Sequence, residues 1–289
     1  MTPFPWLAAL AISVLAAVPS LAEPESPTEL HRRALQEAVA NPSDSVKVED
    51  LIKTLRESPP GSGRYIVEGD ISIAREEIVP YLQSLKDPDI AHSKSDELIV
   101  NVVGGKFDYL VKPEQRKLTY RFEDQTFPSV ASLKFTKEKL RKAADDWEAA
   151  CPECGISFTE VSSNAYFKVR YEPLDDGTVA MAFFPSSPPT QRILFVYAPF
   201  LSPDLDFDAA GVLRHELGHV LGYRHEHIVN IPGCATESGR WKQITPYTPN
   251  SVMHYFCGGK GSFDLSIREA DKRGHRCVYL TGKACPPPT

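Results

Sequence analysis

Three histidines and one glutamate between residues 215 and 225 have the spacing of a metal site. The stretch reads HELGHVLGYRH, with His215 and His219 four residues apart. On a helix, that spacing places both imidazoles on one face, where they can bind one metal ion. Glu216 lies between them and can accept a proton from water at the open side of the metal. Gly222 allows a positive φ that ends the helix and turns the chain, so His225 can return as a third nitrogen ligand.

This set of donors predicts a catalytic zinc site. Three neutral histidines that leave one coordination position open are typical of catalytic zinc, with Zn–N distances of about 2.0–2.1 Å. The zinc lowers the pKa of its water and Glu216 accepts the proton, so that hydroxide can attack a peptide carbonyl. The competing interpretation is a buried helix with incidental histidines. Gly222 and His225, each at the position that the mechanism requires, favour the metal site.

A second motif, SVMHYF from Ser251 to Phe256, carries a resemblance to a known family. Together the two motifs resemble the metzincin zinc peptidases, in which HExxHxxGxxH is followed by a turn that contains methionine. The resemblance implies that Met253 forms the floor beneath the zinc ligands without binding the metal.

Two branches of the metzincins are similar to this sequence. In the astacin-like branch, the tyrosine at the position of Tyr255 is a detachable fifth zinc ligand that later helps to stabilise the oxyanion. Glu226 matches the astacin glutamate that reaches the new N-terminus of the mature enzyme. The motif His-Glu-Leu-Gly-His also resembles a bacterial HEIGH-type branch, and the sequence does not separate the two.

Asp70 belongs to a short segment, YIVEGDISI, that predicts two strands joined by a turn. The residues from Val67 to Asp70 resemble the FxGD segment of astacin-type proforms, with Val67 in place of the usual phenylalanine. That resemblance implies that Asp70 occupies the position of the catalytic water on zinc and keeps the enzyme latent. The alternative is that Asp70 is an ordinary turn residue.

The elements around these motifs predict an α+β fold. Strand patterns follow Lys117, and a helix is expected over Phe135–Ala150 and another around Gly211–Leu221, which indicates a mixed sheet with packed helices. The resemblance implies a metzincin-type zincin with a mixed twisted sheet, an active-site helix and a small C-terminal subdomain. Gly177–Pro185 resembles the edge strand that receives substrate in such enzymes, and an ordinary buried strand is the alternative. Other expected elements are helices over Glu29–Ala40, Val46–Arg56 and Glu76–Leu85, a hairpin at Gly104-Gly105, and a C-terminal helix capped by Ser266.

The N-terminal third divides into two predicted segments. Residues 1–22 read as a cleaved signal peptide, because the apolar stretch is short for a membrane span and ends in Ser20-Leu21-Ala22; a membrane anchor is the alternative. Residues 23–115 form a prosegment-like region, which is either removed or retained as an N-terminal domain. The catalytic domain is expected over residues 116–289.

Six cysteines in an exported chain predict disulfides. Proximity in the sequence favours Cys151–Cys154, Cys234–Cys257 and Cys277–Cys285. A zinc site at Cys151 and Cys154 would need a second ligand pair, and none is evident. His31, His92 and His275 are expected to be surface or packing residues, because they have no partners at ligand spacing. The resemblance implies no role for His227 and His254, which flank the histidine motif.

Composition limits the class of partner. The chain of 289 residues is 42% hydrophobic and 24% charged with a net charge of −6, which argues against a nucleic-acid binder. We expect a polypeptide substrate, one zinc ion and no stable membrane association, and the sequence leaves the oligomeric state open. The sequence therefore predicts a zinc endopeptidase that is secreted, or periplasmic in a bacterium. The alternative is an exported interaction protein on an inactive metzincin scaffold, against which the presence of Glu216 argues.

Overall fold

The computed structural model describes residues 27–57, 60–67, 70, 72–84, 98–175, 177–226, 240–254 and 260–286. Several predictions fall outside these residues and are not tested by the structure. They concern the signal peptide, Glu68 and Gly69 of the Asp70 segment, His92, His227, the pair Cys234–Cys257, and Tyr255.

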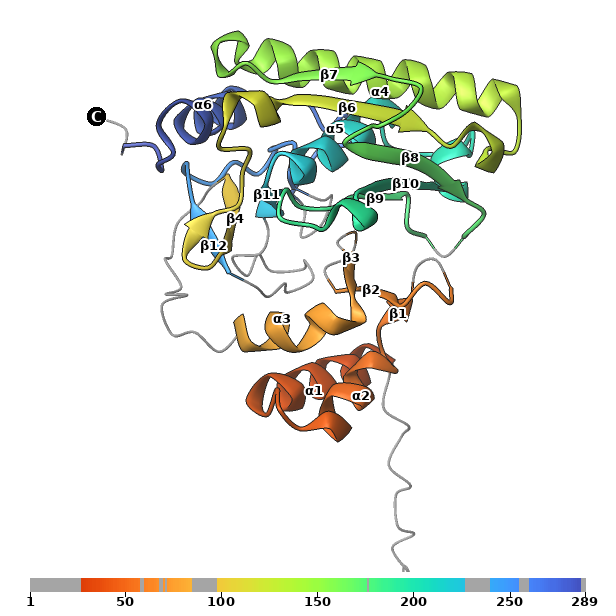
Figure 1. Cartoon of the computed structure of the whole chain (residues 1–289), viewed down its shortest axis with the longest axis vertical. Helices are drawn as coiled ribbons and strands as arrows, with labels where there is room; N and C mark the ends of the chain where they lie inside the picture. Colours follow the sequence, from red (N-terminus) through yellow and green to blue (C-terminus); the bar gives the residue numbers. More distant parts are fainter. Residues whose placement is uncertain are drawn as a thin grey trace, which may run out of the picture.

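A five-stranded mixed sheet forms the centre of the larger part of the chain (Figure 1). Its order is β7-β6-β8-β10-β9, in which the first four strands run parallel and β9 pairs antiparallel with β10 at the edge. The strands are β6 Lys117–Phe122, β7 Ser157–Glu160, β8 Phe167–Glu172, β9 Ala180–Met181 and β10 Ile193–Tyr197. The α+β class with a mixed sheet is therefore confirmed, and the segment predicted as an edge strand does lie at an edge.

Two helices, α4 Val130–Ala150 and α5 Ala209–Val220, cover one face of this sheet. Side chains of β10 alternate: Leu194 and Val196 join the main core, whereas Phe195 and Tyr197 point to the opposite face. Trp147 is fully buried between the helices and donates a hydrogen bond from Nε1 to the carbonyl of Arg214 at 2.8 Å. This contact fixes α5, the helix that carries the predicted metal ligands, against α4.

A second sheet joins residues from before and after α5. It contains β4 Ile99–Val103, β5 Lys106–Phe107, β11 Tyr223–Arg224 and β12 Trp241–Gln243, and β4 pairs with the other three strands. Gly104 and Gly105 form the predicted hairpin turn with φ of 57° and 76°. Leu98, Val100 and Leu110 are buried in the same core as the five-stranded sheet. Residues 98–116 thus pack as part of the larger unit.

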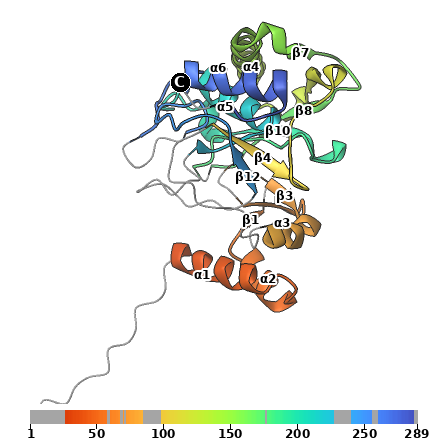
Figure 2. The ribbon, with the colours of Figure 1, turned by 90° about the vertical axis from the view of Figure 1, so that its left-hand side faces the viewer.

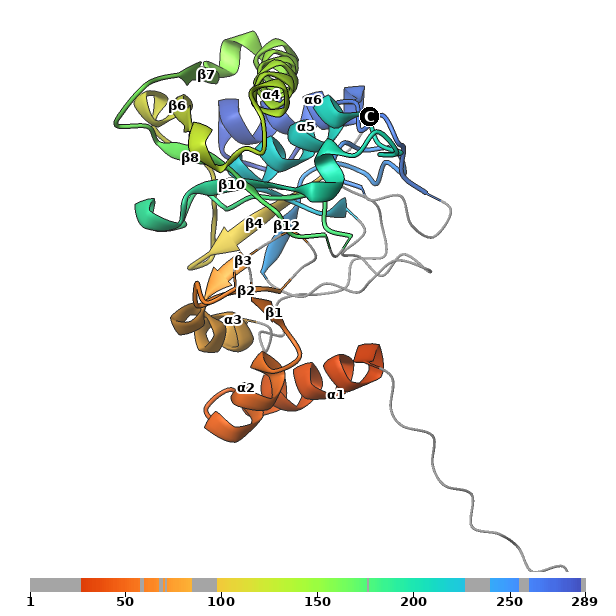
Figure 3. The ribbon, with the colours of Figure 1, turned by 90° about the vertical axis from the view of Figure 1, so that its right-hand side faces the viewer.

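The N-terminal residues form a separate layer, which lies at the opposite end from α4 in all three views (Figures 1, 2 and 3). Its helices are α1 Pro27–Ala40, α2 Ser45–Ile52 and α3 Ile78–Ser84, and its strands are β1 Arg56–Glu57, β2 Arg64–Ile66 and β3 Ser72–Ala74. The helices share a small apolar core, against which Tyr65 and Ile73 pack from the strands. The two strands predicted in the Asp70 segment are confirmed, because Tyr65 pairs with Ile73.

Some predicted boundaries differ from the structure. The second helix ends at Ile52 because Arg56 belongs to β1, and α4 begins earlier than predicted, after the N-cap Ser129. The C-terminal helix α6, Glu269–Arg276, does not start at Ser266 as predicted. Instead, the Asp271 carboxylate accepts the backbone N–H of Arg268, so the cap lies two residues further on. Short 3₁₀ turns occupy Arg75–Glu77, Pro113–Arg116, Asp124–Thr126, Pro152–Cys154, Pro189–Gln191 and Ala198–Leu201, and a π-helical turn follows at Cys277–Thr281.

The disulfides Cys151–Cys154 and Cys277–Cys285 are confirmed. Among the helices of the described ranges, none combines the length and apolar composition needed to cross a membrane.

Candidate metal centre

The helix α5 and the turn after it position the three histidines. The helix begins at the N-cap Asp208, whose carboxylate accepts the backbone N–H groups of Ala210 and Gly211. It ends at Val220, and Gly222 turns the chain with φ of 102°. A Cβ at Gly222 would overlap the carbonyl of Asp108, so only glycine fits this turn. The chain then enters β11 and reaches His225.

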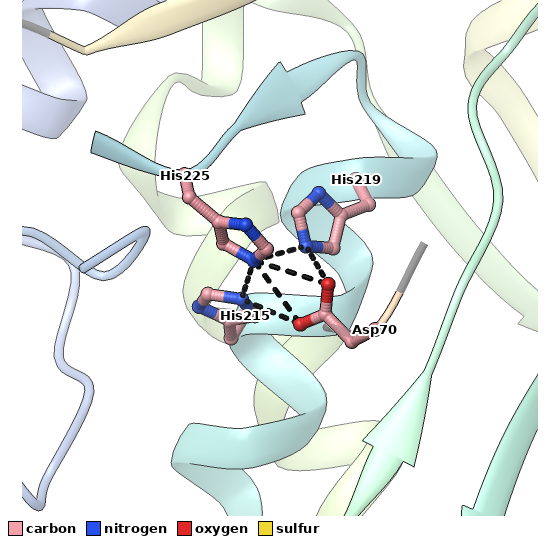
Figure 4. A group of neighbouring side chains, drawn as sticks. All are labelled: Asp70, His215, His219 and His225. Atoms are coloured by element: carbon pink, nitrogen blue, oxygen red, sulfur yellow. Dashed lines mark hydrogen bonds and ion pairs between the residues drawn. The ribbon is translucent and has the colours of Figure 1, made fainter. Parts of the chain in front are cut away.

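The structure brings His215, His219, His225 and Asp70 together (Figure 4). Nε2 of His225 lies 3.1 Å from Nε2 of His215 and 3.2 Å from Nε2 of His219. The Asp70 carboxylate lies 3.2 Å from His215, 3.4 Å from His219 and 3.1 Å from His225, measured from the nearest oxygen in each ion pair. All four side chains are buried. These residues could hold a metal ion.

Hydrogen bonds on the far side of two rings determine which nitrogen faces the centre. Nδ1 of His215 donates to the carbonyl of Val252 at 2.8 Å, and Nδ1 of His219 donates to the carbonyl of Tyr223 at 2.7 Å. A carbonyl only accepts, so each Nδ1 carries the proton and each Nε2 presents a lone pair. Such a tautomer, held by a backbone carbonyl, is typical of histidines that ligate metals.

The donor arrangement fits zinc. The Nε2 lone pairs of His215 and His219 cannot hydrogen-bond to one another, so their convergence with Nε2 of His225 favours a cation between them. A tetrahedral zinc with Zn–N distances of about 2.0–2.1 Å requires its ligand nitrogens to lie about 3.3 Å apart. The two Nε2 separations from His225, 3.1 and 3.2 Å, are close to that value. The Asp70 carboxylate takes the side of the group that a fourth ligand would occupy.

Burial and neighbouring charge perturb the ionisable groups here. Burial lowers the pKa of His219 to about 4, which keeps it neutral and able to ligate. Burial by itself would raise the pKa of Asp70, but its electrostatic interactions with His225 and His219 and its hydrogen bond with His215 lower that pKa well below its usual value. Burial, followed by the negative charge of Asp70, raises the pKa of Glu216 well above its usual value.

Glu216 faces a cavity of about 350 Å³ beside the metal ligands. Its Oε2 atom is buried and has no hydrogen-bond partner among the described residues. The cavity is lined by catalytic candidates, by the segment that leads into β9, and by apolar side chains; the lining residues are Asp70, Gly177, Thr178, Val179, Ala180, Phe207, Val212, His215, Glu216 and Leu265. The cavity therefore lies beside both Glu216 and the segment that leads into β9.

Met253 packs against α5 at Gly218. It is fully buried, and a Cβ at Gly218 would overlap its sulfur. Glu226 donates its backbone N–H to the carbonyl of Met253 at 2.9 Å, and its Oε1 accepts the N–H of Thr248 at 3.1 Å. Glu226 therefore connects the end of the histidine motif to the Met-turn.

Two polar groups that support this centre were missed in the sequence. Asp271 accepts the hydroxyl of Ser251 at 2.6 Å and the N–H of Val252 at 3.2 Å, and the Val252 carbonyl in turn binds His215. Acidic residues are common in the first turn of helices for other reasons, so the position of Asp271 in the sequence does not reveal this role.

The second group is a buried hydrogen-bond network that contacts the turn between His219 and His225. The Asp108 carboxylate accepts the Asn101 amide at 2.9 Å and the Ser186 hydroxyl at 2.7 Å. Asn101 donates its backbone N–H to the carbonyl of Gly222 at 2.8 Å and accepts Arg224 at 3.3 Å. Nothing in the spacing of these residues could have revealed a network whose contacts span as many as 123 positions.

His31 and His275 pack as predicted, and His254 is also buried. His254 is buried against the Tyr247 hydroxyl at 2.9 Å. His31 is half-buried and contacts Thr54 at 2.9 Å. His275 is buried and lies 2.7 Å from the Tyr223 hydroxyl.

No family model and no curated protein matches this chain. Among solved structures, it is similar to a structure of myroilysin, with a TM-score of 0.44 and 17% identity over 63% of this chain and 98% of that chain. A second myroilysin crystal structure gives a TM-score of 0.42 and 18% identity over 62% and 89%. High choriolytic enzyme 1, a hatching enzyme zinc-protease from the medaka fish Oryzias latipes, gives 0.36 and 14% over 60% and 94%. At these TM-scores, function has to be argued from the site itself.

Proposed function

We propose that this chain is a secreted zinc endopeptidase of the metzincin type, made in a latent form. The observation that carries the proposal is the convergence of three histidine Nε2 atoms beside a buried glutamate that faces a cavity. A structural zinc site fills all four positions with protein ligands that stay in place. Here the fourth group, Asp70, comes from the N-terminal layer and from more than 140 positions away.

Each residue has a role that follows from its location. A zinc ion bound by His215, His219 and His225 would supply a Lewis acid that activates water and polarises a peptide carbonyl. The edge strand β9 offers backbone N–H and C=O groups to an extended polypeptide, which places a scissile bond over the cavity. Glu216 accepts a proton from the attacking water and then delivers it to the leaving amine nitrogen. Tyr255, at the oxyanion, stays a prediction.

Latency follows from the position of Asp70. Its carboxylate lies within 3.4 Å of Nε2 of every histidine in the group, so it occupies the space that an attacking water requires. Removal or displacement of the N-terminal layer would open that space. This geometry favours the latency role over that of a simple turn residue.

Packing also bears on where the catalytic unit begins. Leu98 donates its N–H to Thr245 Oγ1 at 2.9 Å, and its carbonyl accepts the N–H of Ile244 at 2.8 Å. Arg116 donates to the carbonyls of Leu110, Val111 and Cys154, and so is not presented as a processing site. We therefore place the start of the catalytic unit at or before Leu98 rather than near residue 116.

The test is digestion of an unfolded polypeptide by the full chain and three variants of equal zinc content. We expect little cleavage by the unaltered chain and at least tenfold faster cleavage by Asp70→Ala, because the open position is restored. Asp70→Ala with Glu216→Gln should bind zinc but lose the cleavage, since the isosteric amide cannot accept a proton. Asp70→Asn serves as the control for charge alone.

Each outcome separates the candidate functions. If Asp70→Ala holds zinc and cleaves nothing, the chain is an interaction protein on an inactive scaffold. If Glu216→Gln cleaves as fast as its parent, Glu216 is not the base. If the unaltered chain is already fully active, Asp70 is a turn residue and the latent form does not exist.

A further inference from the structure

A small apolar surface lies on the face of the five-stranded sheet opposite the main core. It consists of Met181 from β9 and of Phe195 and Tyr197 from β10, which are 0%, 1% and 0% exposed. The rings of Phe195 and Tyr197 are stacked with centroids 6.1 Å apart, and the Tyr197 hydroxyl lies 3.8 Å from the Met181 sulfur. We call these three side chains the outer patch.

The N-terminal layer covers the outer patch with one strand. Ile66 of β2 is 8% exposed and belongs to the same apolar cluster. Arg64, two residues earlier, faces the same way and interacts electrostatically with Tyr197. Tyr65 between them points to the opposite side and packs on the core of α1, α2 and α3. The strand β2 therefore places one apolar side chain, that of Ile66, on the outer patch.

The same stretch of chain also reaches the metal centre. Ile66 and Asp70 are four residues apart, so they are separated by at most about 14 Å when extended. Arg56 from β1 also hydrogen-bonds to Thr178, which lines the cavity beside the edge strand. The N-terminal layer thus contacts the patch, the approach to the edge strand and the metal ligands in one short run of sequence.

We propose that the outer patch is a binding subsite for polypeptide substrate, distinct from the catalytic cavity, that accepts an aliphatic or aromatic side chain. This inference rests on the proposed function, because it concerns the substrate polypeptide that takes the place of the N-terminal layer. The accepted residue lies about three to six positions from the scissile bond, the reach that Ile66 has from Asp70.

A polypeptide substrate is the occupant that the structure favours. The three side chains of the outer patch, even with Leu174 and Ile193 that pack beside them, are too few for a stable dimer, which needs an interface of about 1,200 Å² or more. A substrate already held at the cavity presents its neighbouring residues at high effective concentration, so a single apolar contact is enough to add affinity. Ile66 shows that an apolar side chain on an extended strand fits there.

The experiment uses the full chain with Ile66→Ser and Asp70→Ala, which we call the released chain. The two substitutions remove the contact of Ile66 with the outer patch and that of Asp70 with the histidines. For each position three to six residues from the scissile bond, a pair of fluorescent peptides is compared. The two peptides of a pair share one cleavage sequence and differ only by isoleucine or serine at that position. At one such position, kcat/KM should be about tenfold higher for the isoleucine peptide, the factor that partial burial of one such side chain supports. Phe195→Ala in the released chain should bring the ratio close to one. Phe135→Ala, an equal truncation on α4 outside the patch, should leave the ratio unchanged.

A second readout does not need turnover. Fluorescence anisotropy measures binding of both peptides to the released chain with Glu216→Gln, with and without Phe195→Ala. If both peptides are cleaved equally at every position, the subsite is refuted and the peptidase stands. If nothing is cleaved but the isoleucine peptide binds about tenfold tighter in a Phe195-dependent way, the subsite stands and the proposed catalysis fails. If neither cleavage nor binding differs, the subsite is refuted.

Discussion

The start of the catalytic unit can be tested by two truncated chains, one beginning at Ser95 and one at Lys117. Both lose the N-terminal layer and therefore Ile66 and Asp70. Only the second also loses β4, β5 and the buried network of Asn101 and Asp108. The pair therefore isolates the contribution of residues 95–116.

The expected difference follows from burial. Leu98, Ile99 and Val100 are 0% exposed and Leu110 is 3% exposed. Burying one such side chain contributes about 1.5–3 kcal/mol, so the four together contribute about 6–12 kcal/mol as an upper estimate. A domain of this size is typically stable by about 5–15 kcal/mol. The loss is as large as the whole stability, before the hydrogen bonds of β4 with β11 and β12 are counted.

Thermal unfolding by circular dichroism and zinc titration against a competing chelator would measure the effect. We expect the chain from Ser95 to unfold cooperatively and to bind one zinc, and the chain from Lys117 to do neither. The reasoning is refuted by a chain from Lys117 that unfolds cooperatively and binds one zinc with equal affinity. In that case β4 would be an accessory strand, and the boundary near residue 116 would hold.

Two further substitutions test the supports of the metal centre, and a third tests how stability depends on pH. Gly222→Ala should lower zinc affinity at least tenfold in a chelator competition, because the added Cβ overlaps the Asp108 carbonyl and φ of 102° disfavours alanine. Asp271→Ala should lower zinc affinity about tenfold, because it frees the Met-turn carbonyl that orients His215. Burial lowers the pKa of His275 to about 3 from 6.5, so its contribution to stability is complete above pH 6.5 and is lost as the pH falls toward 3. At pH 5 the loss is about 2 kcal/mol, and His275→Gln should remove that part of the acid dependence in urea unfolding at pH 7 and pH 5.

Each of these predictions has a control. Gly177→Ala, also at positive φ but with open space around it, should leave zinc affinity intact and shows whether strain alone matters. Asp271→Asn keeps one acceptor oxygen for the hydrogen bonds of Asp271 and should restore part of the zinc affinity. A zinc affinity as low as that of Asp271→Ala would assign the effect to the charge of Asp271. Equal loss of stability between pH 7 and pH 5 with and without His275 would contradict the reasoning on that residue.

Much of the fold was accessible from the sequence because local patterns reflect local physics. The turn at Gly104-Gly105, the strands β6, β8 and β10 and the helices α1, α4 and α5 follow from periodicity and turn residues. The start of α4 was predicted too late although its cap, Ser129, is local, whereas at α6 a distant contact contributed to the error. The cap of α6 is set by Asp271, which is held by Ser251 of the Met-turn as well as by its own helix.

The sequence by itself determined the three histidines, Glu216 and Gly222 as one unit, because helical spacing and a glycine turn are local properties of eleven residues. It also offered Asp70 two roles without choosing between them. Only the tertiary structure brought Asp70 to within 3.4 Å of each histidine, buried it there, and seated Ile66 on the outer patch. It likewise joined residues 98–116 to the unit that follows. Most of these contacts connect positions far apart in the sequence, up to 155 residues for Asp70 and His225. They depend on which apolar faces pack together, and no local pattern contains that information.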